Sequence, residues 1–288
     1  MRKNLAASVR ARLLNIAKSE GSNFNQLLVR YALERFLYRL SQSAHADRFL
    51  LKGALLFTLW YDMPHRPTRD ADLLGFGPSD LKSISQTFRD IASITVDDGI
   101  TFDPETVTAE DIRKEAGYAG ARVVIIGELA KARCTTQIDI GFGDAVTPGP
   151  VQSEYPVLLE DFPAPRLRTY PAYTVISEKL HAIALLGMTN SRVKDYLDLW
   201  VMLDRESLNM NTLAQAISAT FTRRGMAVPT DLPLGLSDEF AADPSRQALW
   251  AAFVRKNDLA MIPLADVVTR IRSALDPAMA LAARAPKT

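Results

Sequence analysis

Two aspartates one residue apart, Asp70 and Asp72, stand where a charged stretch runs into an apolar one, in RPTRDADLLGF (66–76). If this segment is a strand, its side chains alternate between two faces, so both carboxylates lie on one face about 6–7 Å apart. Two unpaired carboxylates that close repel each other and lose hydration, whereas a divalent cation removes both penalties. Mg²⁺ is usually held by one or two carboxylates together with phosphate oxygens, so the pair indicates a magnesium site. The structural alternative is that Asp70 caps a turn and Asp72 pairs with Arg66 or Arg69.

A third carboxylate, Asp139, lies in TTQIDIGF (135–142). An isoleucine stands on either side of it, so in a strand Asp139 points away from an apolar face. If this strand pairs beside the one that carries Asp70 and Asp72, the three carboxylates form one cluster. Such a cluster holds one or two Mg²⁺ ions, which clamp a nucleoside triphosphate and activate an attacking hydroxyl.

The segment Lys52-Gly53-Ala54 joins a predicted strand (49–52) to a predicted helix (54–60). A helix N-terminus offers N–H groups and the positive end of the helix dipole to a phosphate. Gly53 lets the backbone approach closely, and Lys52 supplies a positive charge. We therefore expect both residues to contact a bound nucleotide, although a Lys-Gly pair alone does not decide this.

The composition is that of an ordinary globular protein: 288 residues, 48% hydrophobic, 23% charged, net charge +1. With so small a net charge, any binding of nucleic acid must use a local patch. The single cysteine, Cys134, excludes an intramolecular disulfide framework and fits a reducing compartment. No apolar run approaches the ~18 residues of a membrane span, and the N-terminus lacks the apolar core of a signal peptide. We expect a cytoplasmic protein without a membrane partner.

Hydrophobic periodicity predicts an α+β chain with two domains. Strands are predicted at 49–52, 70–76, 121–129 and 134–142, and helices at 5–16, 24–40, 54–60, 80–93, 175–186, 193–203, 212–223, 245–256 and 264–275. Gly and Pro residues after 142 mark a boundary, which gives a first domain at 1–150, with two N-terminal helices, and a mainly helical domain at 151–288. Arg35 and Arg39, one helical turn apart, are interpreted as a solvated basic face. The alanine-rich residues after about 279 are predicted to fray.

Charged residues also recur on two helices of the second domain. Lys179 lies on one, and Asp195 and Asp198 lie at i and i+3 on the other. Arg192 precedes them at the helix start, which is the unfavourable end for a cation and is better tolerated if it holds an external anion. The alternative is a pair of ordinary surface helices.

Together these features resemble the nucleotidyltransferase superfamily, which includes DNA polymerase beta. Its members carry a Gly-Ser turn, a D-x-D and a third acidic residue on a neighbouring strand. Here Ala54 stands in place of the serine, and Thr68 is the candidate to supply a hydroxyl. The closer resemblance is to the AbiEii/AbiGii toxin family of type IV toxin–antitoxin systems. It rests, in order along nearly the whole chain, on ERFLYRL (34–40), RFLLKGALLFTLW (48–60), RPTRDADLL (66–74), QIDIGFGD (137–144), SEKLHAIALLG (177–187), RVKDYLDLW (192–200) and TFTRRG (220–225).

This resemblance implies a nucleotidyltransferase-like N-terminal domain, with a mixed sheet flanked by helices, followed by a helical C-terminal domain. It implies a toxin that is neutralised by a separately encoded, usually DNA-binding antitoxin. Relatives transfer nucleotides, in several cases to the 3′ end of tRNA. The resemblance also marks Lys179 and Asp195 as active-site positions. We expect Lys179 to bind a triphosphate oxygen, Asp195 to orient Lys179 or the acceptor hydroxyl, and Asp198 to be structural.

The leading interpretation is therefore a Mg²⁺-dependent nucleotidyltransferase that moves a nucleoside monophosphate from an NTP to an acceptor hydroxyl on tRNA. In this interpretation Asp70, Asp72 and Asp139 hold the metal, Lys52, Gly53, Arg66, Thr68 and Lys179 contact the nucleotide, and Asp195 completes the catalytic set. One alternative is nucleotidylation or phosphorylation of a protein, or of the chain itself. Another is a non-catalytic member that binds RNA or its partner through Arg122, Lys131, Arg133, Arg166 and Arg168. A monomer is the default oligomeric state.

Overall fold

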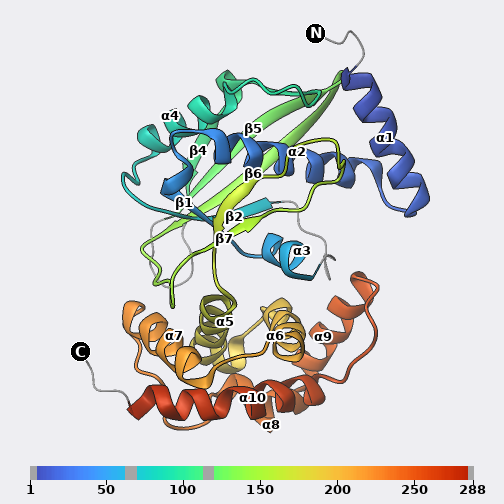
Figure 1. The fold of residues 1–288 in the computed structure, drawn as a ribbon. Helices are drawn as coiled ribbons and strands as arrows, with labels where there is room; N and C mark the ends of the chain where they lie inside the picture. The colour runs from blue at the N-terminus through green and yellow to red at the C-terminus, as the bar shows by residue number, and fades with distance from the viewer. Residues whose placement is uncertain (1–4, 62–69, 113–119, 285–288) are drawn as a thin grey trace. The chain divides into compact units, whose positions relative to one another are not determined.

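The computed structural model describes residues 5–61, 70–112 and 120–284. The chain folds into two compact units, and most of its helices and strands are labelled in Figure 1. The first unit comprises Met1–Gly143 and Val151–Thr169, and the second comprises Asp144–Pro150 and Tyr170–Thr288. The first unit contains helices and a sheet and the second contains helices, so the predicted α+β class is confirmed. The division into domains at residue 150 stays a prediction.

Within the described residues, the first unit has one mixed sheet of eight strands. They are β1 (Phe49–Lys52), β2 (Asp70–Gly75), β3 (Ile100–Phe102), β4 (Thr108–Asp111), β5 (Gly120–Leu129), β6 (Ala132–Phe142), β7 (Val151–Glu154) and β8 (Arg166–Thr169). Their order is β3-β5-β6-β2-β1-β8-β7, and β4 also pairs with β5. Strand β2 is antiparallel to β1 and parallel to β6, so the two strands that carry the predicted acidic residues are direct neighbours.

The sequence predicts β1, β2, β5 and β6, and all four are present within two residues of the expected bounds. Strands β3, β4, β7 and β8 were not predicted. Each has only three or four residues, and β4 and β7 are exposed along most of their length. Hydrophobic alternation, the usual sign of a strand in a sequence, is therefore too short or absent in them.

The described residues of the first unit form four α-helices, and α2 and α4 among them pack against the sheet. They are α1 (Leu5–Ser19), α2 (Phe24–Gln42), α3 (Leu55–Tyr61) and α4 (Leu81–Ala92), with short 3-10 helices η1 (Ala46–Arg48) and η2 (Pro104–Thr106). The side chains of Asn23 and Asp80 cap α2 and α4 by accepting N–H groups of the first turn. Phe36 of α2 stacks on Phe88 of α4, which in turn meets Phe49 of β1 edge to face.

The face under α2 and α4 is apolar because strand register puts like residues side by side. Leu73 of β2 lies beside Ile140 of β6, and Ile138 of β6 lies opposite Val123 of β5. All four side chains are buried. Since side chains alternate along each strand, the intervening residues of β1, β2, β5 and β6 point to the opposite face.

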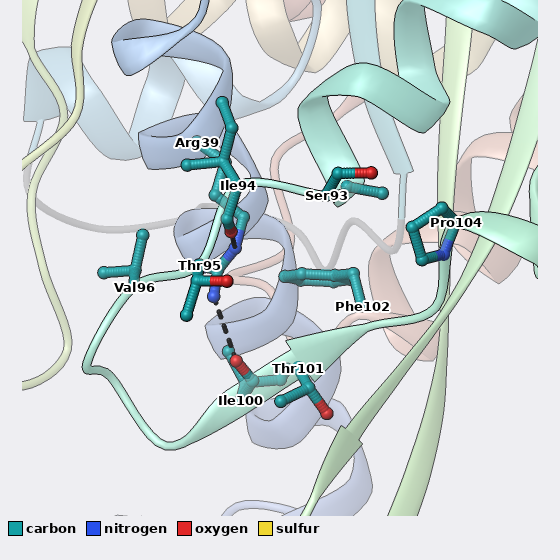
Figure 2. Close-up of a pocket in the computed structure, with 10 residues that line it drawn as sticks. Arg39, Ser93, Ile94, Thr95, Val96, Ile100, Thr101, Phe102 and Pro104 are labelled. Atoms are coloured by element: carbon teal, nitrogen blue, oxygen red, sulfur yellow. Dashed lines mark hydrogen bonds between the residues drawn. The ribbon is translucent and has the colours of Figure 1, made fainter. Parts of the chain in front are cut away.

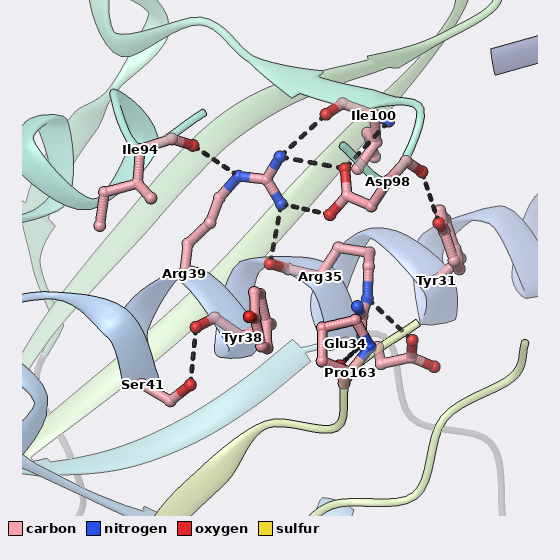
Figure 3. Close-up of polar contacts among 10 residues, drawn as sticks. All are labelled: Tyr31, Glu34, Arg35, Tyr38, Arg39, Ser41, Ile94, Asp98, Ile100 and Pro163. Atoms are coloured by element: carbon pink, nitrogen blue, oxygen red, sulfur yellow. Dashed lines mark hydrogen bonds and ion pairs between the residues drawn. The ribbon is translucent and has the colours of Figure 1, made fainter. Parts of the chain in front are cut away.

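Arg35 and Arg39 do not form a solvated basic face, and that interpretation is wrong. They are 0% and 2% exposed. Arg39 donates hydrogen bonds to both carboxylate oxygens of Asp98 (2.7 and 3.1 Å) and to the carbonyls of Ile94, Ile100 and Arg35 (Figure 3). Helical spacing shows only that two arginines share a side. It cannot show that segments from elsewhere in the chain supply the acceptors that make burial tolerable.

Glu34, also buried on α2, bonds to a segment around Leu158, more than a hundred residues away in the sequence. Its carboxylate pairs with the neighbouring Arg35 (2.9 Å) and accepts the backbone N–H of Leu158 (2.7 Å). Arg35 donates in turn to the carbonyl of Pro163 (3.0 Å). Burial raises the pKa of Glu34 to about 7, although the positive charge of Arg35 acts in the other direction.

The second unit is helical, as predicted. Its helices are α5 (Ala172–Leu186), α6 (Val193–Arg205), α7 (Met210–Arg223), α8 (Asp238–Ala242), α9 (Pro244–Lys256) and α10 (Leu264–Arg284), with 3-10 helices η3 (Gly187–Thr189) and η4 (Leu234–Leu236). Helix α10 packs against α6 and α7. The predicted fraying after residue 279 is wrong, because α10 continues to Arg284 and buries Met279 and Ala282. In the described part of the chain, no helix combines the length and apolar character that a membrane crossing requires.

Candidate active site

A row of four charged residues crosses the face of the sheet opposite α2 and α4. Lys52 of β1 lies opposite Asp72 of β2, Asp72 lies beside Asp139 of β6, and Asp139 lies opposite Arg122 of β5. Register partners on adjacent strands share a face, so the charges follow one another as plus, minus, minus, plus. Asp70 stands two residues before Asp72 on the same face. The expectation that Asp139 lies beside the other two aspartates is confirmed.

Gly53 lies directly against Asp72, at the turn between β1 and α3. Its φ is +74°, and a Cβ at this position would lie 2.8 Å from both Cβ and Cγ of Asp72. A larger residue would therefore be strained in its backbone and would also displace the carboxylate. The structure thus explains the glycine by its packing against Asp72, and its contact with a phosphate stays a prediction.

Asp139 is held by two parallel hydrogen bonds from Arg122. The Nε and Nη2 atoms of Arg122 each lie 2.9 Å from one carboxylate oxygen, and Gln137 adds a weaker contact at 3.4 Å. The side chain of Asp139 is 12% exposed and that of Arg122 is 35% exposed. These hydrogen bonds raise the pKa of Arg122, and the charges of Asp139, Glu110 and Asp70 add to the effect.

The oxygen donors in the row suit Mg²⁺, which is commonly held by one or two carboxylates plus phosphate oxygens. The described residues contain no group of three or more His, Cys, Asp or Glu side chains placed to hold a metal ion. Both oxygens of Asp139 face Arg122 instead. The donor set therefore fits a site made by Asp70 and Asp72 and completed by nucleotide oxygens. Asp139 can take a full part only if Arg122 releases it.

Two predicted nucleotide contacts, Arg66 and Thr68, lie outside the described residues. Arg69, the other proposed partner of Asp72, also lies there. Their predicted roles stay predictions.

In the second unit, Lys179 of α5 forms ion pairs with two carboxylates of α6. Its Nζ lies 2.9 Å from Asp195 and 2.6 Å from Asp198. The lysine side chain is 13% exposed, and those of Asp195 and Asp198 are 1% and 0% exposed. The sequence thus identifies three residues that the fold does bring together. Asp198 is as closely engaged as Asp195.

Among Lys179, Asp195 and Asp198, electrostatic attraction outweighs the effect of burial on the pKa values of Lys179 and Asp195. Burial by itself would lower the pKa of Lys179, but the negative charges of Asp195 and Asp198 outweigh it and raise that pKa. Burial would likewise raise the pKa of Asp195, but Lys179 and Arg192 outweigh it and lower the pKa. Arg192 itself pairs with Asp195 (2.7 Å), so the cation at this helix start has an anion within the protein.

A second charged cluster of this unit surrounds Arg224, the second arginine of the TFTRRG motif. Arg224 pairs with Asp144 (3.1 Å) and Glu178 (3.2 Å), and its Nη1 lies 3.5 Å from Nδ1 of His181. Burial and the positive charge of Arg224 lower the pKa of His181 to about 4. The cluster links α5, the end of α7 and residue 144, which indicates a structural role.

A pocket of about 310 Å³ lies elsewhere in the first unit, beyond the end of α4 (Figure 2). Ile94, Val96 and Phe102 form part of its wall. The Arg39 guanidinium at this pocket is already bonded to the carbonyls of Ile94 and Ile100. Among the described residues that line the pocket none is acidic, so it lacks the ligands that a metal–nucleotide complex requires.

A comparison with known families decides the class of this protein. A model of the family described as nucleotidyl transferase AbiEii toxin, type IV toxin–antitoxin system, matches residues 35–276. The chain belongs to the AbiEii toxin family. The matched range begins in α2, ends in α10 and contains every candidate site residue named above. Membership in the AbiEii family confirms the predicted class, a nucleotidyltransferase toxin of a type IV system, and implies a cognate antitoxin.

Two solved structures from Helicobacter pylori are similar to this AbiEii chain. One is a protein proposed to be a nucleotidyltransferase, 16% identical, with 85% of this chain and 91% of that chain covered and a TM-score of 0.46. The other is JHP933, 15% identical, with 85% and 88% covered and a TM-score of 0.47. Among the curated proteins compared, none matches the AbiEii chain.

Sequence reasoning did not connect Arg122 with the acidic residues and counted it among surface cations for RNA or partner binding. The structure bonds it to Asp139. A tight turn at Ala130 and Lys131, both at positive φ, puts residue 122 opposite residue 139. These residues are not the Asn-Gly or Asp-Gly pair by which such a turn is recognised in a sequence, so the register gave no clear signal in advance. Of the other cations in that set, Arg166 pairs with Glu154, and Arg168 donates to the carbonyl of Asp47.

Proposed function

We propose that this toxin is a Mg²⁺-dependent nucleotidyltransferase that transfers a nucleoside monophosphate from an NTP to the 3′ end of tRNA. The proposal is carried by the register of β2 and β6, which puts Asp72 and Asp139 side by side with Asp70 on the same face. Transfer of a phosphoryl-linked group depends mainly on positioning and on charge stabilisation, and adjacent carboxylates that gather metal charge serve both.

In this mechanism Asp70 and Asp72 are the metal ligands, and Asp139 joins them. When bound, Mg²⁺ supplies positive charge to the phosphates. Gly53 keeps the turn clear so that the Asp72 carboxylate holds its position. Lys52, the neighbour of Asp72 in the row, contributes a fixed positive charge to the phosphates.

Lys179, oriented by Asp195, is proposed to bind a triphosphate oxygen, and Arg66 and Thr68 are proposed as further phosphate contacts. The acceptor hydroxyl gives its proton to water and forms a bond to the α-phosphorus. The bond from that phosphorus to the bridging oxygen breaks, and pyrophosphate leaves. The neutralising partner is proposed to be a DNA-binding antitoxin.

The test uses α-labelled NTPs, one base at a time, with the full-length protein and either purified tRNA or lysate proteins. We expect label on tRNA with Mg²⁺ and none with a chelator. The isosteric change Asp72→Asn is expected to reduce labelling about 100-fold or more, because it removes charge where the phosphates need it. Asp111→Asn, an exposed change on β4 of the same sheet, serves as the matched control and should label at the wild-type rate.

Two results would count against this proposal in different ways. Labelling that is the same in Asp72→Asn and in wild type would exclude Asp72 and its neighbouring carboxylates from the mechanism. Label on a protein, or on the toxin itself, instead of tRNA would keep nucleotidyl transfer but give it a different acceptor.

A further inference from the structure

The contact between Arg122 and Asp139 affects how the carboxylates of this charged row can bind a metal ion. The guanidinium occupies both oxygens of the Asp139 carboxylate at 2.9 Å. The pairing follows from the β5–β6 register, so it belongs to the fold rather than to a chance surface contact. Both oxygens of Asp139 already accept hydrogen bonds from Arg122. A divalent ion that bound to Asp139 would therefore compete with these bonds and would be repelled by the positive charge of the guanidinium.

We infer that Arg122 is a positioning residue that keeps Asp139 from a divalent ion until a nucleotide is bound, so that metal and NTP bind together rather than separately. This inference rests on the proposed function. A guanidinium binds phosphate as readily as carboxylate, with the same pair of parallel hydrogen bonds. A triphosphate beside the row therefore offers Arg122 a second acceptor and frees Asp139.

The exposure of the two side chains fits such an exchange. Arg122 is 35% exposed, so its guanidinium reaches solvent from which a phosphate can arrive, while Asp139 is 12% exposed and stays within the row. Glu110 lies opposite Arg122 on β4, across β5 from Asp139, so a second carboxylate stands beside the arginine on the same face of the sheet.

The experiment measures Mn²⁺ affinity by the loss of the free-ion magnetic resonance signal, with and without a non-hydrolysable NTP analogue. Wild-type protein is expected to bind Mn²⁺ weakly alone and tightly with the analogue. Arg122→Gln removes the competing charge and is expected to bind Mn²⁺ about tenfold more tightly without nucleotide. Arg133→Gln is the matched control, because Arg133 is an exposed arginine opposite Glu128 on the same hairpin, and it should match wild type.

An unchanged or lower nucleotide-free Mn²⁺ affinity in Arg122→Gln overturns the inference. If that variant does not fold, Arg122→Lys is used instead. Lysine keeps the positive charge but cannot form two parallel hydrogen bonds to Asp139, so the nucleotide-free Mn²⁺ affinity should rise by about threefold. Asp72→Asn separates the two proposals. If wild type with the analogue binds Mn²⁺ no better than Asp72→Asn does, the proposed function fails. If it binds better and Arg122→Gln still has no effect, only the role of Arg122 is refuted.

Discussion

Replacing Lys179 by methionine tests whether this lysine stabilises the second unit, serves the nucleotide, or does both. The change keeps most of the side-chain volume but removes the Nζ that bonds to Asp195 and Asp198. It leaves two carboxylates that are 1% and 0% exposed. Removing one partner of a buried ion pair costs roughly 3–5 kcal/mol. Arg192 still faces Asp195, so we expect the lower end of that range.

The assay is thermal unfolding followed by circular dichroism. For a chain of this size, 1 kcal/mol corresponds to roughly 2–4 °C, so Tm should fall by about 10 °C. Lys194→Met is the matched control, because Lys194 is an exposed lysine on the same helix α6 as the two aspartates. It makes the same change of charge and should leave Tm within about 1 °C of wild type.

The pH dependence of the Lys179→Met effect gives a second check on its cause. The raised pKa of Lys179 means that its stabilisation is present below about pH 10.5 and is lost as pH rises further. The lowered pKa of Asp195 means that its stabilisation is present above about pH 3.8 and is lost as pH falls. The Tm difference between wild type and Lys179→Met should therefore be largest from neutral pH to about pH 9 and should shrink as pH falls. The two buried carboxylates that remain in the variant have lost the lysine and take up protons more readily.

Activity measured well below the Tm of Lys179→Met then separates the two roles. An unchanged Tm together with lost NTP binding would refute the stability argument and leave Lys179 as a nucleotide ligand alone. A lowered Tm together with wild-type transfer at low temperature would remove it from the site. Loss of toxicity in cells does not distinguish these cases, because an unfolded toxin is also inactive.

Two further substitutions follow from the first unit. Gly53→Ala should lower transfer about 100-fold, since a Cβ there displaces the Asp72 carboxylate; Gly21→Ala, at a similar φ of +64° with open space around it, should lose about 1 kcal/mol of stability and keep full transfer. Glu34 has a folded-state pKa of about 7 against an ordinary 4.5, so its share of the stability is full below pH 4.5 and falls as pH rises through 7. That loss is about 3 kcal/mol. In Glu34→Gln the free energy of unfolding should therefore depend less on pH over this range than it does in wild type. The same pH dependence in both proteins would contradict the role of Glu34.

The parts of the fold that could be predicted from sequence are those with strong periodicity. Strand β5 alternates between buried and less buried residues along most of its length, β6 does so as far as Ile138, and β2 carries its two aspartates on the polar face. The adjacency of β2 and β6 could not be derived from either strand alone, since strand order depends on how the whole sheet packs. It followed only from a resemblance, and the structure then supplied the register.

The charged residues show where sequence reasoning stops. A sequence displays an arginine as a polar residue and does not display its partner. Arg39, Arg122 and Arg224 all bond to acidic residues, and the partners of Arg39 and Arg224 lie dozens of positions away. Reading such arginines as a basic surface for RNA overcounts the charge that solvent or a ligand meets. Even for Arg122, whose partner lies in the same hairpin, the pairing depends on a register that the turn residues Ala130 and Lys131 do not signal.

The charges of the row formed by Lys52, Asp72, Asp139 and Arg122 also bear on the inference that this toxin binds metal and nucleotide together. Lys52 and Arg122 flank Asp72 and Asp139, so the row itself carries no net charge, and Asp70 adds one negative charge. A divalent ion alone brings more positive charge than this face can balance. A triphosphate alone brings negative charge beside two or three carboxylates. In the complex of the two, the ion offsets part of the triphosphate charge and stands in for Arg122 beside Asp139. A guanidinium that turns from carboxylate to phosphate then leaves neither anion without a cation.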